Sequence, residues 1–143
     1  MVPSSRGWEN GRRMTGAILI VDDNISIREV LTDILDSIAA TIFTAANGQE
    51  GLEILQQHRQ IIGLVLLDMN MPVLNGEQTY EKLQEITPDV KVIVLTSLSK
   101  AEVQYRFGYL ETPTYLQKPF EVDTLLNVVQ AELANSLSSV AVS

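Results

Sequence analysis

The chain contains no cysteine, so disulfide bonds, thiolate nucleophiles and cysteine-bound metal sites are all excluded. This absence is compatible with an intracellular protein. Histidine is almost as scarce, because His58 is the only one in the sequence. It lies in the segment LQQHRQ at the end of a predicted helix, where we expect a solvent-exposed side chain rather than a phosphodonor or a metal ligand.

Long apolar runs are also absent. No run approaches the roughly 18 residues that a membrane span needs. Arg12 and Arg13 precede the short apolar segment 16–21, in the manner of an export signal, but Asp22 and Asp23 end that segment too early for one. We therefore expect a cytoplasmic protein that does not bind a membrane.

Basic residues are outnumbered. Ten Lys and Arg stand against 18 Asp and Glu, which gives a net charge of −8. This is the wrong sign for holding a phosphate backbone, so we expect no direct nucleic-acid binding. With 143 residues, of which 45% are hydrophobic and 20% charged, the composition is that of one globular domain with a sizeable core.

The ends of the chain differ from its middle. Residues 1–13 are polar, with no helical or strand period, and we expect a disordered tail, a linker or a vector-derived scar there. The single domain is predicted to span residues 14–134. Residues 135–143 are small and polar, which predicts a flexible C-terminal tail.

Within the predicted domain, short β-branched apolar runs alternate with stretches that have helical spacing. This alternation is typical of a parallel α/β sheet that is buried between two layers of helices. The predicted strands are 17–21, 41–45, 64–67, 91–95 and 115–117. The predicted helices carry apolar stripes at Ile27–Val30–Leu31–Ile34–Leu35–Ile38, Leu52–Leu55, Tyr80–Leu83, Val103–Phe107–Leu110 and Val122–Leu125–Leu126–Val129–Leu133.

Polar side chains follow four of these strands. Asp22 and Asp23 come after the first strand, Asp68 after the third, Thr96 after the fourth and Lys118 after the fifth. Ligands of open parallel sheets bind beyond the carboxyl ends of the strands, so we expect these groups to converge. Three neighbouring carboxylates stay ionised only beside a positive charge, and oxygen ligands without histidine or cysteine favour Mg²⁺. Lys118 and Thr96 could then stabilise a phosphoryl group that a carboxylate attacks, which favours phosphoryl transfer.

Four separated segments resemble the receiver domain of two-component response regulators, in particular its chemotaxis-regulator type. They are Asp22-Asp23, LVLLDMNMPVLNGE around Asp68, VLTS ending at Ser97, and YLQKPF around Lys118. They occur in the family's order, and each falls at the end of a predicted strand. The resemblance covers residues 16–133 and implies a flavodoxin-like (βα)5 doubly wound α/β fold, with a five-stranded parallel sheet in the order 2-1-3-4-5.

The resemblance also implies a role for each residue of the site. Asp68 would be the phosphoacceptor, taking a phosphoryl group from the phosphohistidine of a sensor histidine kinase or a phosphotransfer protein. Mg²⁺ would be held by Asp23 and Asp68, by Asp22 mostly through water, and by the backbone carbonyl of Asn70. The remaining members would bind the phosphoryl group or move in response to it: Lys118 pairs with the developing charge, Thr96 turns its hydroxyl onto the phosphoryl group, Tyr115 turns inward, and small Ser97 leaves room for the phosphodonor.

The output surface follows from the same resemblance. It implies a partner face around 100–109 and 121–129, read by a downstream protein target or an attached output domain, with a possible homodimer. Where receivers commonly carry a Gly-Ala pair, this chain has Glu111 and Thr112, followed by Pro113, which predicts a reshaped loop before the last strand.

Other interpretations remain open at this point. Asp22 and Asp23 could cap the first helix, and Asp68 could be a turn residue. The chain could be a receiver-like interaction module that is never phosphorylated, or a receiver cut from a hybrid histidine kinase. A Mg²⁺-dependent phosphohydrolase would need a second carboxylate two residues after the nucleophile, and that position is Asn70. We therefore expect a phosphoacceptor switch that assists its own phosphotransfer and autodephosphorylation, not an enzyme.

Overall fold

A computed structural model describes residues 8–9, 12–13, 16–39, 41–69, 75–108 and 113–142. Its main sheet has five parallel strands in the order β4-β3-β5-β6-β7. The strands are β3 (Ala17–Val21), β4 (Ile42–Ala45), β5 (Ile62–Asp68), β6 (Lys91–Thr96) and β7 (Thr114–Gln117). In chain order within this sheet the arrangement is 2-1-3-4-5, so the flavodoxin-like (βα)5 expectation is confirmed.

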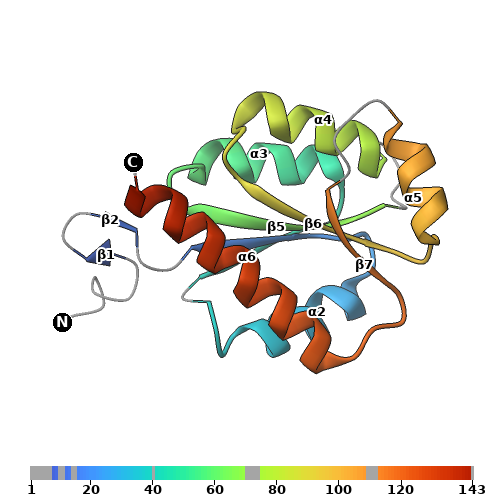
Figure 1. Cartoon of the computed structure of the whole chain (residues 1–143), viewed down its shortest axis with the longest axis horizontal. Helices are drawn as coiled ribbons and strands as arrows, with labels where there is room; N and C mark the ends of the chain where they lie inside the picture. The colour runs from blue at the N-terminus through green and yellow to red at the C-terminus, as the bar shows by residue number, and fades with distance from the viewer. Residues whose placement is uncertain are drawn as a thin grey trace.

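Helices cover both faces of the sheet (Figure 1). One face carries α2 (Ile25–Leu35) and α6 (Val122–Val142), and the other carries α3 (Gly48–His58) and α4 (Gly76–Ile86). Helix α5 (Lys100–Phe107) packs its buried Val103 and Phe107 into the same core as α3 and α4. All five helices begin after a strand ends, as the alternating sequence pattern predicts.

Two hydrophobic clusters, one on each side of the sheet, hold the layers together. Successive side chains of a strand point to opposite faces, so β5 contributes Val65 and Leu67 to one cluster and Leu64 and Leu66 to the other. All seven residues of β5 are buried. This central strand ends at Asp68, and its burial fixes the position of that carboxylate.

Two features differ from the sequence pattern. Trp8–Glu9 (β1) pairs antiparallel with Arg12–Arg13 (β2), a contact of two residues per strand that is too short to show a period in the sequence. Helix α6 continues past Leu133 to Val142, because the segment contains no proline or glycine to end it. The helix thus extends about nine residues beyond the last position of the apolar stripe. None of the helices in the described part of the chain is long and apolar enough to cross a membrane.

Asparagine or serine begins each of the four helices α2 to α5. The caps are Asn24, Asn47, Asn75 and Ser99, and each side-chain oxygen accepts a backbone N–H in the first turn of its helix. Such caps satisfy donors that have no partner within the helix. They fix the helix starts next to the carboxyl ends of the strands, where the polar residues lie.

Candidate functional site

Three carboxylates meet at the carboxyl edge of the sheet. Asp22 and Asp23 follow β3, and Asp68 is the last residue of the neighbouring strand β5. One carboxylate oxygen from each of the three lies within 4.8 Å of the others. Asp22 and Asp68 are buried and Asp23 is exposed. The convergence that the sequence predicts for these three residues is confirmed.

Lys118 supplies the positive charge of this cluster. Its Nζ lies 3.5 Å from Oδ1 of Asp68 and 3.8 Å from Oδ2 of Asp22. The lysine follows β7, and its backbone N–H donates to the carbonyl of Thr96 at the end of β6. The Lys118 side chain is partly exposed, so its ammonium attracts the carboxylates while it stays in contact with solvent.

Asp22 is the most constrained of the three acids. Its Oδ1 accepts the backbone N–H of Asn24 at 2.9 Å, but its buried Oδ2 has no hydrogen-bond partner within the described residues. Burial raises the pKa of Asp22, while the Asn24 hydrogen bond and Lys118 act in the opposite direction; Asp23 raises it further and Arg28 lowers it. A buried oxygen without a donor, facing two other carboxylates, fits a divalent cation.

The capping alternative for the two acids after β3 is not borne out. Asn24, not Asp22 or Asp23, caps α2, because its side chain accepts the N–H of Ile27 at 3.1 Å. Asp22 instead holds the N–H of Asn24, and Asp23 projects to the surface. Both carboxylates lie close to that of Asp68, and Asp22 also lies beside Lys118.

Thr96 lies buried at the end of β6, and its hydroxyl faces the following loop. Its Oγ1 accepts the backbone N–H of Leu98 at 3.0 Å, two residues before α5 begins. Ser97 is exposed beside it. The hydroxyl of Thr96 is thus connected directly to the segment that leads into α5.

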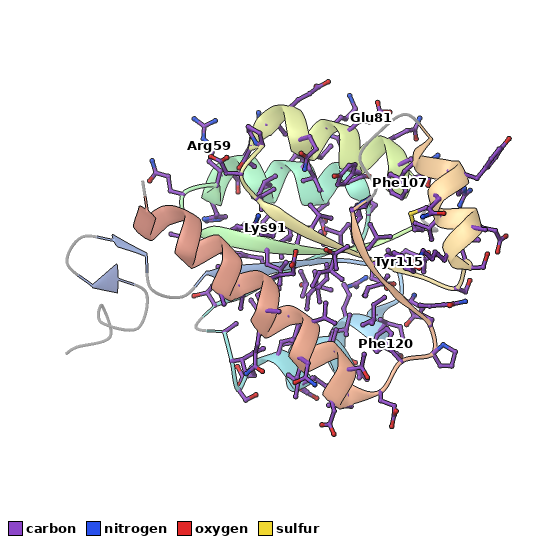
Figure 2. All side chains as sticks on the ribbon, in the orientation of Figure 1. Arg59, Glu81, Lys91, Phe107, Tyr115 and Phe120 are labelled. Carbon is purple, nitrogen blue, oxygen red and sulfur yellow. The ribbon has the colours of Figure 1, made fainter. Side chains whose placement is uncertain are left out.

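The other predicted residues lie apart from the acids or beyond description. Tyr115 is half-buried on β7 beside Val94 of β6, and packs against the core that includes α5 (Figure 2). Asn70, Glu111 and Thr112 lie outside the described residues. His58 is not solvent-exposed as expected: it is half-buried, and its ring stacks on Phe43 with centroids 4.4 Å apart.

Two residues near the site make contacts that the sequence pattern does not predict. Arg28 of α2 donates from Nη1 to the backbone carbonyl of Asp22 at 2.7 Å. Gly76 is the first residue of α4, and the helix lies very close to the end of β5 at this point. A Cβ on Gly76 would lie 2.7 Å from Cα of Met69, the residue after Asp68. Spacing in the sequence does not reveal either contact, because both join a strand end to the following helix.

Replacing Asp22 by Asn should stabilise the cation-free protein at neutral pH. Because burial raises the pKa of Asp22 above 3.8, the folded state binds its proton more tightly than the unfolded state does. The stability that this proton provides is present near pH 4 and is lost as the pH rises through the folded pKa. We expect Asp22→Asn to gain about 1 kcal/mol at pH 7, and much less at pH 4, by urea unfolding. The exposed Asp89→Asn is the control, and a mutant less stable than wild type at pH 7 would contradict this account.

The site geometry agrees with comparisons to known proteins. Residues 18–130 match the response regulator receiver domain family. The chain belongs to this family. It is 32% identical to Sporulation initiation phosphotransferase F of Bacillus subtilis, over 84% of this chain and 95% of that protein. It is 30% identical to Transcriptional regulatory protein ZraR of Escherichia coli, over 85% of this chain but only 27% of that longer protein.

Solved receiver structures are equally similar. Chemotaxis protein CheY4 of Vibrio cholerae matches with a TM-score of 0.73 and 30% identity, covering 83% of this chain and 99% of that one. The CheX-CheY-BeF3-Mg²⁺ complex from Borrelia burgdorferi matches with a TM-score of 0.74 and 26% identity, covering 90% and 96%. The chain is thus a receiver domain of two-component systems, and its acidic cluster is consistent with a phosphoacceptor site.

Proposed function

We propose that Asp68 is the phosphoacceptor of this receiver domain. The observation that carries the proposal is the contact of its carboxylate with Lys118 at 3.5 Å, next to two further acids. Asp68 ends the buried central strand, so its carboxylate is held at a fixed point on the sheet edge. Asp22 is the more deeply buried of the two acids beside Lys118, and its distance to the lysine is longer, 3.8 Å.

The proposed reaction is phosphoryl transfer from a phosphohistidine to Asp68. A carboxylate oxygen of Asp68 forms a new bond to phosphorus, and the bond from phosphorus to the histidine nitrogen breaks. The electron pair of that bond returns to the imidazole, which takes up a proton. Lys118 stabilises the negative charge on the phosphoryl oxygens during the transfer, because its ammonium already faces Asp68.

Asp22, Asp23 and Asp68 would hold Mg²⁺, and the backbone carbonyl of Asn70 is a further proposed ligand. Their oxygens lie within 4.8 Å of one another, and Oδ2 of Asp22, which has the Lys118 ammonium at 3.8 Å but no hydrogen bond within the described residues, is available to a cation or its water. Bound there, Mg²⁺ offsets the repulsion between the carboxylates and the incoming phosphoryl group. The three acids would hold the cation next to the point where the phosphoryl group arrives.

The proposed output is a change around α5 and β7. Thr96 would give up the N–H of Leu98 and donate its hydroxyl to the phosphoryl group, and Tyr115 would turn inward. Ser97, next to Thr96 in the chain, is small and exposed, which leaves access for the phosphodonor. The segments 100–109 and 121–129 are the proposed partner face, for a downstream protein or an attached output domain in the cytoplasm. Two settings fit the same switch: a homodimer that forms through this face, and a receiver that is part of a hybrid histidine kinase.

The rival from another class is a receiver-like module that binds partners without being phosphorylated. Gathering like-charged acids is costly because their carboxylates repel one another, and here two of the three, Asp22 and Asp68, are also buried. A module without phosphorylation gains nothing from this cost. The intact set of three acids, Thr96 and Lys118 therefore favours the phosphoacceptor.

Removing Asp23 should remove most of the Mg²⁺ dependence of phosphorylation. We expect wild type to gain one phosphoryl group by intact mass after incubation with acetyl phosphate and Mg²⁺, and much less with EDTA. Asp23→Ala loses one proposed ligand, so labelling at millimolar Mg²⁺ should fall at least about tenfold. Glu29→Gln, an exposed acid on the adjacent helix, is the control. Labelling of Asp23→Ala that kept the Mg²⁺ response of wild type would remove Asp23 from the site.

A further inference from the structure

Arg28 connects helix α2, which follows the first strand of the main sheet, to the turn that carries Asp22 and Asp23. It lies on α2, six residues after Asp22, and its Nη1 donates to the backbone carbonyl of Asp22 at 2.7 Å. That carbonyl follows the last paired residue of β3, Val21, so the next strand does not satisfy it. A buried carbonyl without a donor is costly, and the guanidinium supplies one.

The hydrogen bond of Arg28 closes a small network around the turn from β3 to α2. The N–H of Asn24 donates to Oδ1 of Asp22, and the side chain of Asn24 accepts the N–H of Ile27. The backbone N–H of Arg28 in turn donates to the carbonyl of Asn24 at 3.1 Å. The turn that carries both Asp22 and Asp23 is thus bound to α2 by the main chain and by the Arg28 side chain.

Arg28 is placed by the helix on which it lies. Its backbone N–H donates to the carbonyl of Asn24, and its backbone carbonyl accepts the hydroxyl of Thr32 at 2.7 Å. Arg28 also borders a surface groove of about 560 Å³ between α2 and the edge strand β4, with Thr32 and Ile42 among the lining residues. The planar guanidinium thus reaches the turn from a helix whose start is fixed by the Asn24 cap.

We propose that Arg28 is a positioning residue for the divalent-cation site, acting through the backbone of Asp22. This inference rests on the proposed function of the acidic cluster. Arg28 holds the Asp22 carbonyl, so that the side chains of Asp22 and Asp23 leave the turn in the directions that face Asp68. It touches neither the cation nor the phosphoryl group.

Two effects of Arg28 on cation binding have opposite signs, which makes the proposal testable. As a positive charge beside the acids, Arg28 repels a second cation, so its removal would tighten binding. As a brace for the turn, it favours the binding geometry, so its removal would weaken binding. Residues that orient metal ligands typically cost 10-fold to 100-fold in metal affinity when they are removed. We expect the bracing effect to be the larger one.

The experiment is Mg²⁺ titration by calorimetry of wild type, Arg28→Ala and Arg28→Lys. We expect Arg28→Ala to bind Mg²⁺ about 10-fold more weakly and Arg28→Lys to recover part of the loss. Amide exchange of residues 22–27 without Mg²⁺ should be faster in Arg28→Ala, with the rest of the sheet unchanged. Labelling by acetyl phosphate should need more Mg²⁺ for half-saturation, but its rate at saturating Mg²⁺ should change much less.

Arg59→Ala is the matched control, because it removes the same charge far from the cation site. In Figure 2, Arg59 lies on the other side of the molecule from Tyr115, which is on β7, the strand that leads to Lys118. Equal or tighter Mg²⁺ binding by Arg28→Ala, with wild type binding and phosphorylated normally, overturns the positioning role alone. Unchanged amide exchange at 22–27 also overturns it. A wild type that neither binds Mg²⁺ nor gains a phosphoryl group overturns the proposed function itself, and this inference with it.

Discussion

The variant Asp68→Asn should gain no phosphoryl group under conditions in which wild type gains one. The asparagine amide is neutral and has nearly the same shape, so the fold should be kept while the nucleophile is lost. Loss of a catalytic nucleophile commonly lowers rates by factors of about 10⁴ to 10⁶, which puts the label far below detection. The measurement is intact mass after incubation with acetyl phosphate and Mg²⁺, sampled from the first seconds.

Two controls make this result specific. Asp89→Asn removes an exposed carboxylate by the same chemical change and should label like wild type. The adduct of wild type should be lost in alkali, as expected of an acyl phosphate. Mg²⁺-dependent labelling that persisted in Asp68→Asn would show that another residue accepts the group. A wild type without any adduct, even at the earliest times, would favour the silent interaction module.

The variant Gly76→Ala should damage both the fold and the site. In an ordinary helix, alanine is more stable than glycine by about 1 kcal/mol. Here the added Cβ would lie 2.7 Å from Cα of Met69 and 3.2 Å from the carbonyl oxygen of Asp68, both backbone atoms. Overpacking of this kind typically costs about 1–3 kcal/mol, and a displaced nucleophile loses about 100-fold in rate. We expect a lower free energy of unfolding in urea and slower labelling of Asp68.

A second variant, destabilised at a distance from the site, separates the loss of folding stability from the direct effect on Asp68. Leu133→Ala removes a buried side chain next to Gly16, at the start of β3 and therefore at the other end of the sheet from Asp68. It should cost about 2–5 kcal/mol or somewhat less, since Leu133 lies at the rim of the core. Compared well below both melting temperatures, Leu133→Ala should label like wild type while Gly76→Ala labels slowly. Equal labelling of the two variants would contradict a role for the close approach at Gly76.

The sequence predicts most of this architecture because strand burial leaves a strong signal. The runs AILIV and LVLLD are apolar on both faces, as a strand between two helical layers requires, and the structure places them at the centre of the sheet. The convergence of Asp22, Asp23 and Asp68 follows from the parallel topology alone. The order of the strands needed the resemblance to the receiver family, since local patterns do not encode which strands are neighbours.

The features that the sequence did not predict depend on local contacts that leave no helical or strand periodicity in the sequence. The length of α6 beyond Leu133 is set by the absence of a helix breaker, not by an apolar stripe. Helix α5 ends at Phe107 and is followed by Gly108, whose φ of +45° does not continue a helix, and Leu110 of the predicted stripe lies outside the described residues. The contacts of Arg28 and Gly76 each join backbone to a residue whose own pattern is ordinary.

The hydrogen bond from Leu98 to Thr96 gives the proposed switch a quantitative limit. In the proposed switch the Thr96 side chain rotates toward the phosphoryl group, which would move its Oγ1 away from the Leu98 amide and so link the occupancy of Asp68 to the position of residues 97–99. Exchanging one such bond for another changes an equilibrium by about 0.5–1.5 kcal/mol, or roughly 2-fold to 13-fold. Linkage is reciprocal, so a protein that binds only the released form of α5 must prolong or promote phosphorylation by the same factor. A partner of this receiver would therefore act as an allosteric effector of Asp68 as well as a reader of its state.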